Sequence, residues 1–255
     1  MANLTITLIG GPTALIAYGG FRVVIDPTFD PPGDYKLPYT TLTKTVGPAL
    51  SADALGPVDA VLVSHDQHWD NLDHSGRNYF LKAKHAFTTK AGAARLGGNV
   101  AGLAPWENTT IHNAVGKTLT ITATPARHGP AGIEPLSGDV IGFVLGVENA
   151  RSVYVTGDTT WFDGTAEVAN RFDIGAVLPF AGAAQTRGPF NLTMNTNDVI
   201  ETARHFSKAA IVPVHSDSWA HLTQTRGDIA ASFKTMGIEA RLTILQPGVA
   251  TEIRL

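Results

Sequence analysis

The sequence predicts an α/β domain in which β-sheets are covered by helices. Three observations predict it. The chain has 255 residues, a length that one large hydrophobic core can serve. Its N-terminal part has the residue pattern of strands, and its C-terminal third alternates between strand-like and helix-like segments. The chain shows no linker and no repeat of short period, so we expect a single domain over residues 1–255.

The N-terminal strands are expected to form a hairpin. Leu4–Ile9 alternates, Ala14–Tyr18 follows a Gly-Gly-Pro turn, and a second Gly-Gly pair leads into Arg22–Ile25. The Pro- and Gly-rich segment 27–33 is expected to be a loop. Further strands are expected at Ala60–Ser64, Thr118–Thr124, Val140–Leu145, Ser152–Thr156, Ile174–Leu178, Ala210–Val214 and Ala240–Leu245. Helices are expected at Ser75–Lys82, Lys90–Leu96, Asp163–Arg171, Thr196–Phe206 and Arg226–Met236.

The composition excludes several function classes. The net charge is −3, so a broad basic surface for nucleic acid is not expected. The chain contains no cysteine, which excludes disulfides, thiolate catalysis and Cys-ligated metal sites. The N-terminal residues do not resemble a signal peptide, and the longest apolar runs have the length of strands. We therefore expect a soluble cytoplasmic protein that does not enter membranes.

Metal-binding residue types follow four apolar runs. VDAVLVS precedes His65, TLTITATPAR precedes His128, SVYVTG precedes Asp158, and AAIVPV precedes His215. Ligands in α/β folds gather at the carboxyl ends of strands, and imidazole with carboxylate suits Zn, Fe or Mn. A single His after a strand is more often structural, and Asp158 alone could be a turn residue. The recurrence at four strand ends, with His68 and Asp70 nearby, favours a metal site.

In this order the elements resemble the metallo-β-lactamase superfamily, and more narrowly its branch of ascorbate-6-phosphate lactonase-like predicted hydrolases. The resemblance implies a four-layer αββα sandwich of two mixed β-sheets. The family has a motif of the type HxHxDH, then a lone His, a bridging Asp and a final His, to which His128, Asp158 and His215 correspond. The segment TLIGGPTALIAYGGFRVVIDP resembles the family's N-terminal hairpin and implies that Asp26 supports the site. The resemblance extends from about Leu4 to His221.

The first motif, SHDQHWDNLD, departs from the family's pattern. With one inserted residue, His65, His68 and Asp70 fill the first three roles, and Asn71 stands where the last His is expected. A frame that begins at Asp66 instead of His65 also uses His68, Asp70 and Asn71. We therefore prefer His68 and Asp70 most strongly, and then His65 ahead of Asp66.

The resemblance also implies how many metal ions are held. The last His of the motif helps to hold a second ion, and the carbonyl oxygen of Asn71 is a poorer ligand for Zn than imidazole. We expect one tightly held divalent ion, Zn or else Mn or Fe, at His65, His68 and His128. The second site is expected to be weaker or empty and to consist of Asp70, Asp158 and His215. Residues that could orient these ligands are Asp73, His74 and His221.

The function implied is hydrolysis of an ester, lactone, amide or phosphodiester bond in a small molecule. A divalent metal would activate water, and Asp70 would orient that water or accept its proton. Arg127 and Arg187 could hold a phosphate. The Trp residues near the predicted ligands could line a pocket or belong to the core: Trp69, Trp161 and Trp219. An oligomer is compatible with the sequence, which contains no feature that decides it.

The main alternative is a non-catalytic metal-binding or sensor protein of the same fold. Gln67, Trp69 and Asn71 favour it, because they make the first motif degenerate. The His, Asp and His of the later strands favour the enzyme, because they are all retained. A phosphodiesterase that acts on a long polyanion is disfavoured by the acidic balance of the chain.

Overall fold

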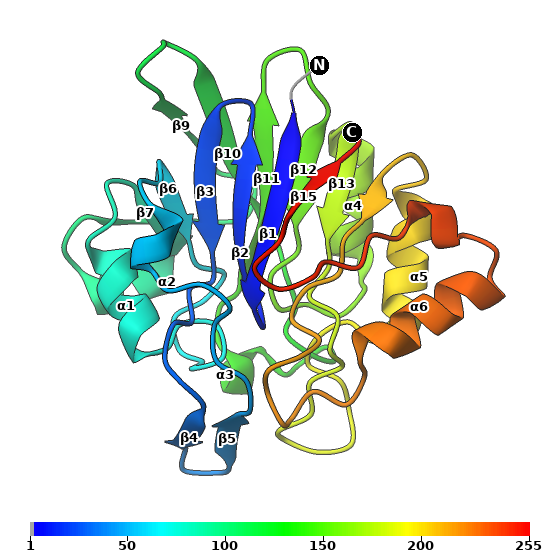
Figure 1. Cartoon of the computed structure of the whole chain (residues 1–255). Helices are drawn as coiled ribbons and strands as arrows, with labels where there is room; N and C mark the ends of the chain where they lie inside the picture. The colour runs from blue at the N-terminus through cyan, green and yellow to red at the C-terminus, as the bar shows by residue number, and fades with distance from the viewer. Residues whose placement is uncertain (1–2) are drawn as a thin grey trace.

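The computed structural model describes residues 3–255. Two β-sheets pack face to face, with helices on the outer face of each, so that the layers follow the order helix, sheet, sheet, helix (Figure 1). This is the expected αββα sandwich, and the fold class predicted from the sequence is confirmed.

The first sheet has seven strands in the order β15-β1-β2-β3-β6-β7-β8. Its strands are β1 (Leu4–Gly10), β2 (Thr13–Tyr18), β3 (Phe21–Ile25), β6 (Ala60–Leu62), β7 (Ala86–Thr89), β8 (Val100–Leu103) and β15 (Ala250–Ile253). The expected hairpin of β2 and β3 is present, with Tyr18 paired to Phe21 across a turn in which Gly19 and Gly20 have φ of 62° and 92°. From β3 to β8 the pairing is parallel, so the carboxyl ends of these strands meet at one edge.

The second sheet has six strands in the order β14-β13-β12-β11-β10-β9. Its strands are β9 (Asn108–His112), β10 (Thr118–Pro125), β11 (Ile141–Val147), β12 (Ser152–Val155), β13 (Ile174–Leu178) and β14 (Ala210–Ile211). The pairing is antiparallel from β9 to β12 and parallel from β12 to β14. Both sheets are therefore mixed, as expected.

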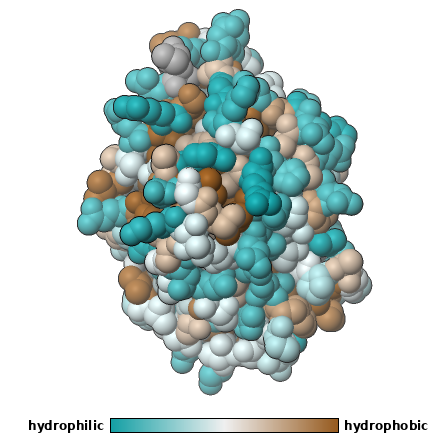
Figure 2. All heavy atoms as spheres, turned by 90° about the vertical axis from the view of Figure 1, so that its right-hand side faces the viewer, coloured by the Kyte–Doolittle hydropathy of each residue, from teal (hydrophilic) through white to brown (hydrophobic). Residues whose placement is uncertain are grey.

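The helices cover the outer faces. On the first sheet lie α1 (His74–Leu81) and α2 (Lys90–Leu96), and on the second lie α4 (Asp163–Arg171), α5 (Thr196–His205) and α6 (Arg226–Thr235). The short elements are η1 (Asp53–Leu55), α3 (Glu134–Ser137) and η2 (Glu239–Arg241). The polar cluster before Thr196 caps α5 as expected, because Asn195 accepts a hydrogen bond from the N–H of Asp198. The face that carries α5 and α6 is largely hydrophilic, with hydrophobic residues in scattered areas (Figure 2).

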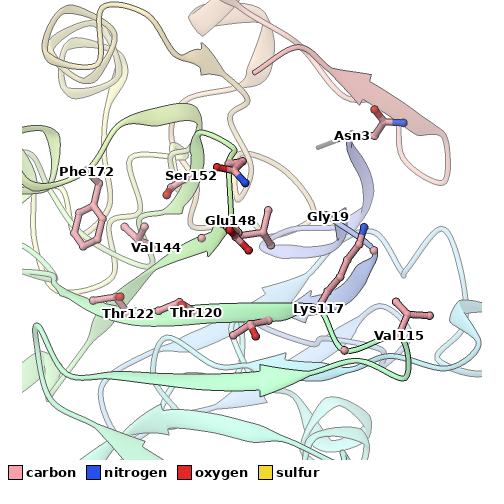
Figure 3. A pocket seen from close by; sticks show the side chains of 16 residues that line it. Asn3, Gly19, Val115, Lys117, Thr120, Thr122, Val144, Glu148, Ser152 and Phe172 are labelled. Carbon is pink, nitrogen blue, oxygen red and sulfur yellow. The ribbon is translucent and has the colours of Figure 1, made fainter. Parts of the chain in front are cut away.

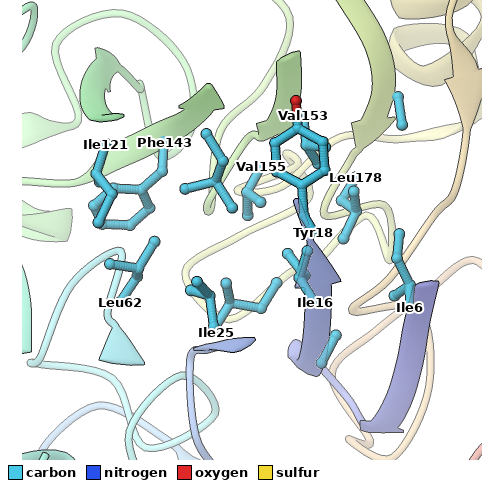
Figure 4. Packing of buried hydrophobic residues seen from close by; sticks show 14 of the residues in the cluster. Ile6, Ile16, Tyr18, Ile25, Leu62, Ile121, Phe143, Val153, Val155 and Leu178 are labelled. Carbon is cyan, nitrogen blue, oxygen red and sulfur yellow. The ribbon is translucent and has the colours of Figure 1, made fainter. Parts of the chain in front are cut away.

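The main core lies between the two sheets. Side chains from β2 and β3 point towards side chains from β10, β11 and β12 (Figure 4), among them Ile16, Tyr18, Ile25, Ile121, Phe143, Val153 and Val155. Separate apolar clusters lie between each sheet and its helices. This double packing holds the strand ends of both sheets in fixed positions next to each other.

Two expected strands differ from the structure. The strand expected at Ala240–Leu245 is absent: η2 occupies its start, and Leu242 makes only an isolated bridge to Ile211. The guanidinium of Arg241 donates to the carbonyls of Ala203, Phe206 and Ala209 next to the end of α5, which fixes the segment against that helix. The strand expected at Ala210–Val214 is shortened to β14, because Pro213 has no N–H to continue a ladder.

A small hairpin not expected from the sequence projects beyond the carboxyl ends of the sheets. It consists of β4 (Gly33–Lys36) and β5 (Thr41–Lys44), which form a two-stranded sheet (Figure 1), and Lys44 at the end of β5 makes an isolated bridge to Trp219. None of the helices within residues 3–255 has the length and apolar character needed to cross a membrane.

Candidate metal centre

The six predicted ligands meet at the carboxyl ends of the strands. They form two groups whose ligand atoms lie within 4.8 Å of one another. The first group is His65, His68, His128 and Asp158, and the second is Asp70, Asp158 and His215. Asp158 belongs to both, so two adjoining metal positions would share its carboxylate.

The spacing in the first group matches the edges of a metal coordination shell. The Nδ1 atom of His68 lies 2.9 Å from Nε2 of His65 and 3.1 Å from Nε2 of His128. Oδ2 of Asp158 lies 3.4 Å from Nε2 of His128 and 3.9 Å from Nε2 of His65. Four donors at the usual distance from Zn are separated by about 3.4 Å in a tetrahedron. Three imidazoles and one carboxylate oxygen would thus surround a single ion.

The second group is equally compact. Nε2 of His215 lies 3.4 Å from Oδ2 of Asp70 and 3.5 Å from Oδ1 of Asp158. His221, whose side chain is 9% exposed, adds a contact of 3.0 Å from its Nε2 to Oδ2 of Asp70. Two carboxylates facing one imidazole form a more strongly anionic donor set than the first group.

Hydrogen bonds orient the imidazoles of the first group. Oγ of Ser64 lies 2.9 Å from Nδ1 of His65 and donates to Oδ2 of Asp26. Nδ1 of His128 lies 2.8 Å from the carbonyl oxygen of Leu192, to which it donates. In both residues the remaining Nε2 is directed at the centre, which is the role of outer partners in metal sites.

The imidazoles of the first group are held neutral. Burial lowers the pKa of His65 well below its ordinary value. Burial also lowers the pKa of His68 and that of His128 to about 4. A neutral imidazole has a free electron pair at neutral pH, so this group can accept a metal without first losing a proton.

The second group has the opposite electrostatics. Burial acts to lower the pKa of His215, but the carboxylates of Asp158 and Asp70 outweigh it and raise that pKa to about 9. Burial also raises the pKa of Asp158 to about 6. The pKa of Asp70 lies well below its usual range, because the imidazoles of His221 and His215 outweigh the effect of burial. The two carboxylates therefore attract positive charge to this position.

Unpaired buried atoms show that the residues fit a cation. Within residues 3–255, the buried side-chain atoms without a hydrogen-bond partner include Oδ1 of Asp158 and both ring nitrogens of His215. A buried polar group without a partner is costly, and several around one point indicate a ligand. Nitrogen and carboxylate donors suit Zn, Mn or Fe.

Within the first motif, the side chain of His65 lies in the first group of donors. Asp66 points elsewhere and receives hydrogen bonds from the guanidinium of Arg95, which ties the loop to α2. Asn71 is buried and donates from Nδ2 to Asp26 at 3.0 Å, so its side chain supports the loop. The sequence left both frames open, since the partner Arg95 is 29 residues away.

The other residues considered from the sequence have varied positions. Asp73 caps α1 through the N–H of Gly76, whereas His74 is largely exposed and pairs with Asp30. Arg127 stacks on Phe162, with its Cζ 4.8 Å from the ring centre. The predicted aromatic candidates pack elsewhere: Trp69 and Trp219 against Tyr35 beneath the small hairpin, and Trp161 against His205 of α5.

Two neighbouring cavities lead to the centre. The inner cavity has a volume of about 20 Å³ and is lined by His68, Asp70, His128 and His221 among others. The outer cavity has a volume of about 660 Å³, and both cavities are lined by Tyr39 and Thr186. Sequence reasoning named His221 only as a residue that could orient ligands, and it missed Tyr39, because the small hairpin was not expected.

A large hollow of about 1030 Å³ lies at the opposite end of the sheets, by the Gly19–Gly20 turn (Figure 3). Among its described lining residues, Glu148 is the only one with a carboxylate, and none has an imidazole. Its size therefore does not make it a candidate for the chemistry.

Comparisons with known proteins agree with this fold. Residues 21–216 match the beta-lactamase superfamily domain. The UPF0173 protein YddR of Bacillus subtilis (strain 168) is 25% identical over 255 residues, covering 96% of this chain and 98% of that protein. A UPF0173 metal-dependent hydrolase of Myxococcus xanthus (strain DK1622) is 26% identical over 250 residues, covering 92% of this chain and 78% of that protein.

Solved structures show the same architecture. An isothiocyanate hydrolase from Delia radicum gut bacteria superposes with a TM-score of 0.83 and 24% identity, covering 97% of this chain and 98% of that one. The metallo hydrolase Igni18 from Ignicoccus hospitalis superposes with a TM-score of 0.71 and 17% identity, covering 99% of each chain. Since the family's domain spans most of the two sheets and all six clustered residues, the chain belongs to the beta-lactamase superfamily.

Proposed function

We propose that this enzyme, a metal-dependent hydrolase of the metallo-β-lactamase fold, cleaves an ester, lactone, amide or phosphodiester bond in a small molecule. The observation that supports it is the pair of adjoining donor groups that share Asp158 and border an inner cavity. That cavity, of about 20 Å³, has room for about one water molecule. A water and a reacting bond can therefore meet next to the donors.

The proposed metal is Zn, with Mn or Fe also suited to the donor set. When bound, a divalent ion supplies Lewis-acid activation of water and of the substrate's electrophilic centre. We assign the tighter position to His65, His68 and His128, whose imidazoles are neutral without it. The weaker position is that of Asp70, Asp158 and His215, where a proton on His215 competes.

Asp70 is the proposed group that orients the attacking water. Its carboxylate lines the inner cavity and is buried, and the neighbouring imidazoles keep it ionised. An ionised carboxylate within hydrogen-bond reach can hold a water in place and accept its proton. His221 contacts the same carboxylate and fixes its orientation.

The bond type is proposed at a finer level from two likenesses. The sequence resembles the ascorbate-6-phosphate lactonase-like branch, which favours a lactone. The similar isothiocyanate hydrolase suggests an isothiocyanate, whose electrophilic carbon also reacts by addition of water. Substrates of both kinds belong in the first activity screen, together with simple esters and phosphodiesters.

The first experiment measures metal content by elemental mass spectrometry in the wild type and in the His128→Ala and His215→Ala variants. We expect one to two metal equivalents in the wild type. The His128→Ala variant should lose the tight ion, and His215→Ala should lose only the second. His112→Ala is the matched control, because His112 is exposed on β9 and should keep full content.

The substrate screen uses the same metal-loaded proteins together with an Asp70→Asn variant. Removing the proposed water-orienting group should lower turnover by about 10²–10⁴-fold while His65, His68 and His128 still hold metal. Full turnover in that variant with metal present would refute the role of Asp70. Metal binding without turnover of any substrate would instead favour the non-catalytic sensor function.

A further inference from the structure

The two cavities at the centre differ in size by more than an order of magnitude. The inner one, at about 20 Å³, can admit a water and the atoms of a reacting group but not a whole substrate. The outer one, at about 660 Å³, falls in the range of small-molecule sites. Tyr39 and Thr186 line both, so the two cavities lie next to each other.

The outer cavity has an apolar lining. Ile133 and Leu136 come from the segment around α3, and Phe190 comes from the loop between β13 and α5. Among the residues of the described chain that line it, none carries a carboxylate. Leu136 is 60% exposed and Tyr39 is 45% exposed, so apolar surface faces solvent here.

Arg187 is the single charged residue among those described that line the outer cavity, and its guanidinium is already engaged. Its Cζ lies 3.8 Å from the ring centre of Tyr39, and its Nη2 donates to the carbonyl of Leu136 at 2.9 Å. It therefore links the tip of the small hairpin to α3. Its positive charge disfavours cationic groups in this cavity.

We propose that the outer cavity is the binding subsite for a neutral aliphatic or aromatic substituent of the substrate. The substrate is then a small electrophile whose slender reacting group enters the inner cavity while its apolar substituent stays between Leu136, Phe190 and Tyr39. This inference rests on the proposed hydrolase function and adds the substrate class to it.

The test measures kcat/KM of the metal-loaded enzyme for 4-nitrophenyl acetate, butanoate and hexanoate, with metal-free protein as the blank. Each buried methylene should raise kcat/KM by about fourfold until the subsite is filled. An ester of similar length that ends in an ammonium group should fall well below hexanoate, and so should one that ends in a phosphate. A preference for the phosphate-ended ester would overturn the apolar assignment.

Two variants locate the effect. The Leu136→Glu substitution places a charge in the apolar lining. It should therefore reduce the increase in kcat/KM from the acetate ester to the hexanoate ester. Val115→Glu is the matched control: Val115 is 79% exposed on the distant turn between β9 and β10, so the rise should persist. An equal rise in the Leu136→Glu variant would place the substituent elsewhere.

A binding measurement separates failure of this inference from failure of the hydrolase function. Calorimetry with acetohydroxamate and hexanohydroxamate, which bind metals through the same group, needs no turnover. Tighter binding of the longer compound supports the subsite even where every ester is inert, an outcome that would count against ester hydrolysis and not against the subsite. Equal dissociation constants would overturn the subsite, whatever the esters show.

Discussion

His215 and Asp26 have backbone conformations that most residues avoid. Their φ angles are 55° and 38°, in the left-handed region that favours glycine. Such a conformation costs about 1–3 kcal/mol and persists only where surrounding contacts hold it. The N–H of His215 donates to the carbonyl of Gly11, and that of Asp26 donates to the carbonyl of Leu62. Two of the six non-glycine residues with positive φ in the described chain are therefore a proposed ligand and the residue that supports another.

Titration of His215 gives the two metal positions different pH dependence. Because the pKa of His215 is about 9, an ion entering the second group must displace a proton at neutral pH. Its affinity should fall about tenfold for each pH unit below 9. The affinity of the first group for its ion should change little between pH 6.5 and 8.5, since the pKa values of His68 and His128 are about 4.

Zinc titrations by calorimetry at pH 6.5, 7.5 and 8.5 check this difference. Proton release is measured in buffers of different ionisation enthalpy. About one proton should be released for each ion that binds the second group, and almost none for each ion that binds the first group. Equal slopes for the two ions would show that His215 is not protonated in the metal-free protein.

The sequence predicted the positions of the clustered residues better than their supports. His128, Asp158 and His215 follow apolar runs, a pattern that local sequence reveals. The contact of His221 with Asp70 spans 151 residues, and Arg95 reaches Asp66 across 29, so local pattern could not reveal either pair. That these residues bind metal stays a prediction, which the metal analysis tests.

At the scale of elements, a buried ion pair holds the small hairpin in place. Nζ of Lys44, at the end of β5, lies 2.9 Å from Oδ2 of Asp73, the residue that caps α1, and the two side chains are 3% and 0% exposed. The Lys44 ammonium also donates to the carbonyl of Thr28. The hairpin that carries Tyr39 is thereby fixed to the loop that carries His68 and Asp70.

Removing the lysine should destabilise the protein considerably. Lys44→Met leaves the Asp73 carboxylate buried without its cation, for which we expect a loss of about 3 kcal/mol in the free energy of unfolding. Lys90→Met is the control, because Lys90 and its partner Glu107 are exposed. The free energy of unfolding of this variant should stay within about 1 kcal/mol of the wild-type value. Urea unfolding measures both, and similar losses in the two variants would contradict the account.

The elements missed from the sequence are short and lack strong periodicity. β4 and β9 consist mainly of polar residues, GDYK and NTTIH, and they are strands only because a neighbour pairs with them. The segment Ala240–Leu245 is the reverse case, because its pattern predicts a strand that the structure does not form. The contacts of Arg241 with the end of α5 hold this segment in another conformation. Tertiary contacts decided both outcomes.

At the scale of the whole molecule, the two sheets touch directly beside the donors. The N–H of Ile141, at the start of β11, donates to the carbonyl of Ser64 after β6. Gly157, with φ of 61°, allows this approach: a Cβ there would lie 2.5 Å from the carbonyl oxygen of Ile141 and 2.9 Å from Cβ of Ser64. Asp158 thus reaches His65 across the interface between sheets.

Gly157→Ala should separate the two halves of the centre. A methyl group at this point forces Asp158 away from His65 and His128, so we expect metal affinity to fall about 10–100-fold. Gly56→Ala is the control, since Gly56 has a similar φ of 65° and nothing within 4 Å of an added Cβ. Dialysis followed by elemental analysis measures retention, and unchanged affinity in Gly157→Ala would contradict this role of the interface.

The donor set of imidazoles and carboxylates has a consequence for the chemical durability of the protein. The chain has no cysteine, so no thiol is available anywhere in it for alkylation, nitrosation or oxidation to a sulfenic acid. Iodoacetamide and N-ethylmaleimide at neutral pH therefore find no thiol to modify. A centre of this kind can meet soft electrophiles that disable thiol-dependent enzymes, and the protein holding it has no thiol to lose.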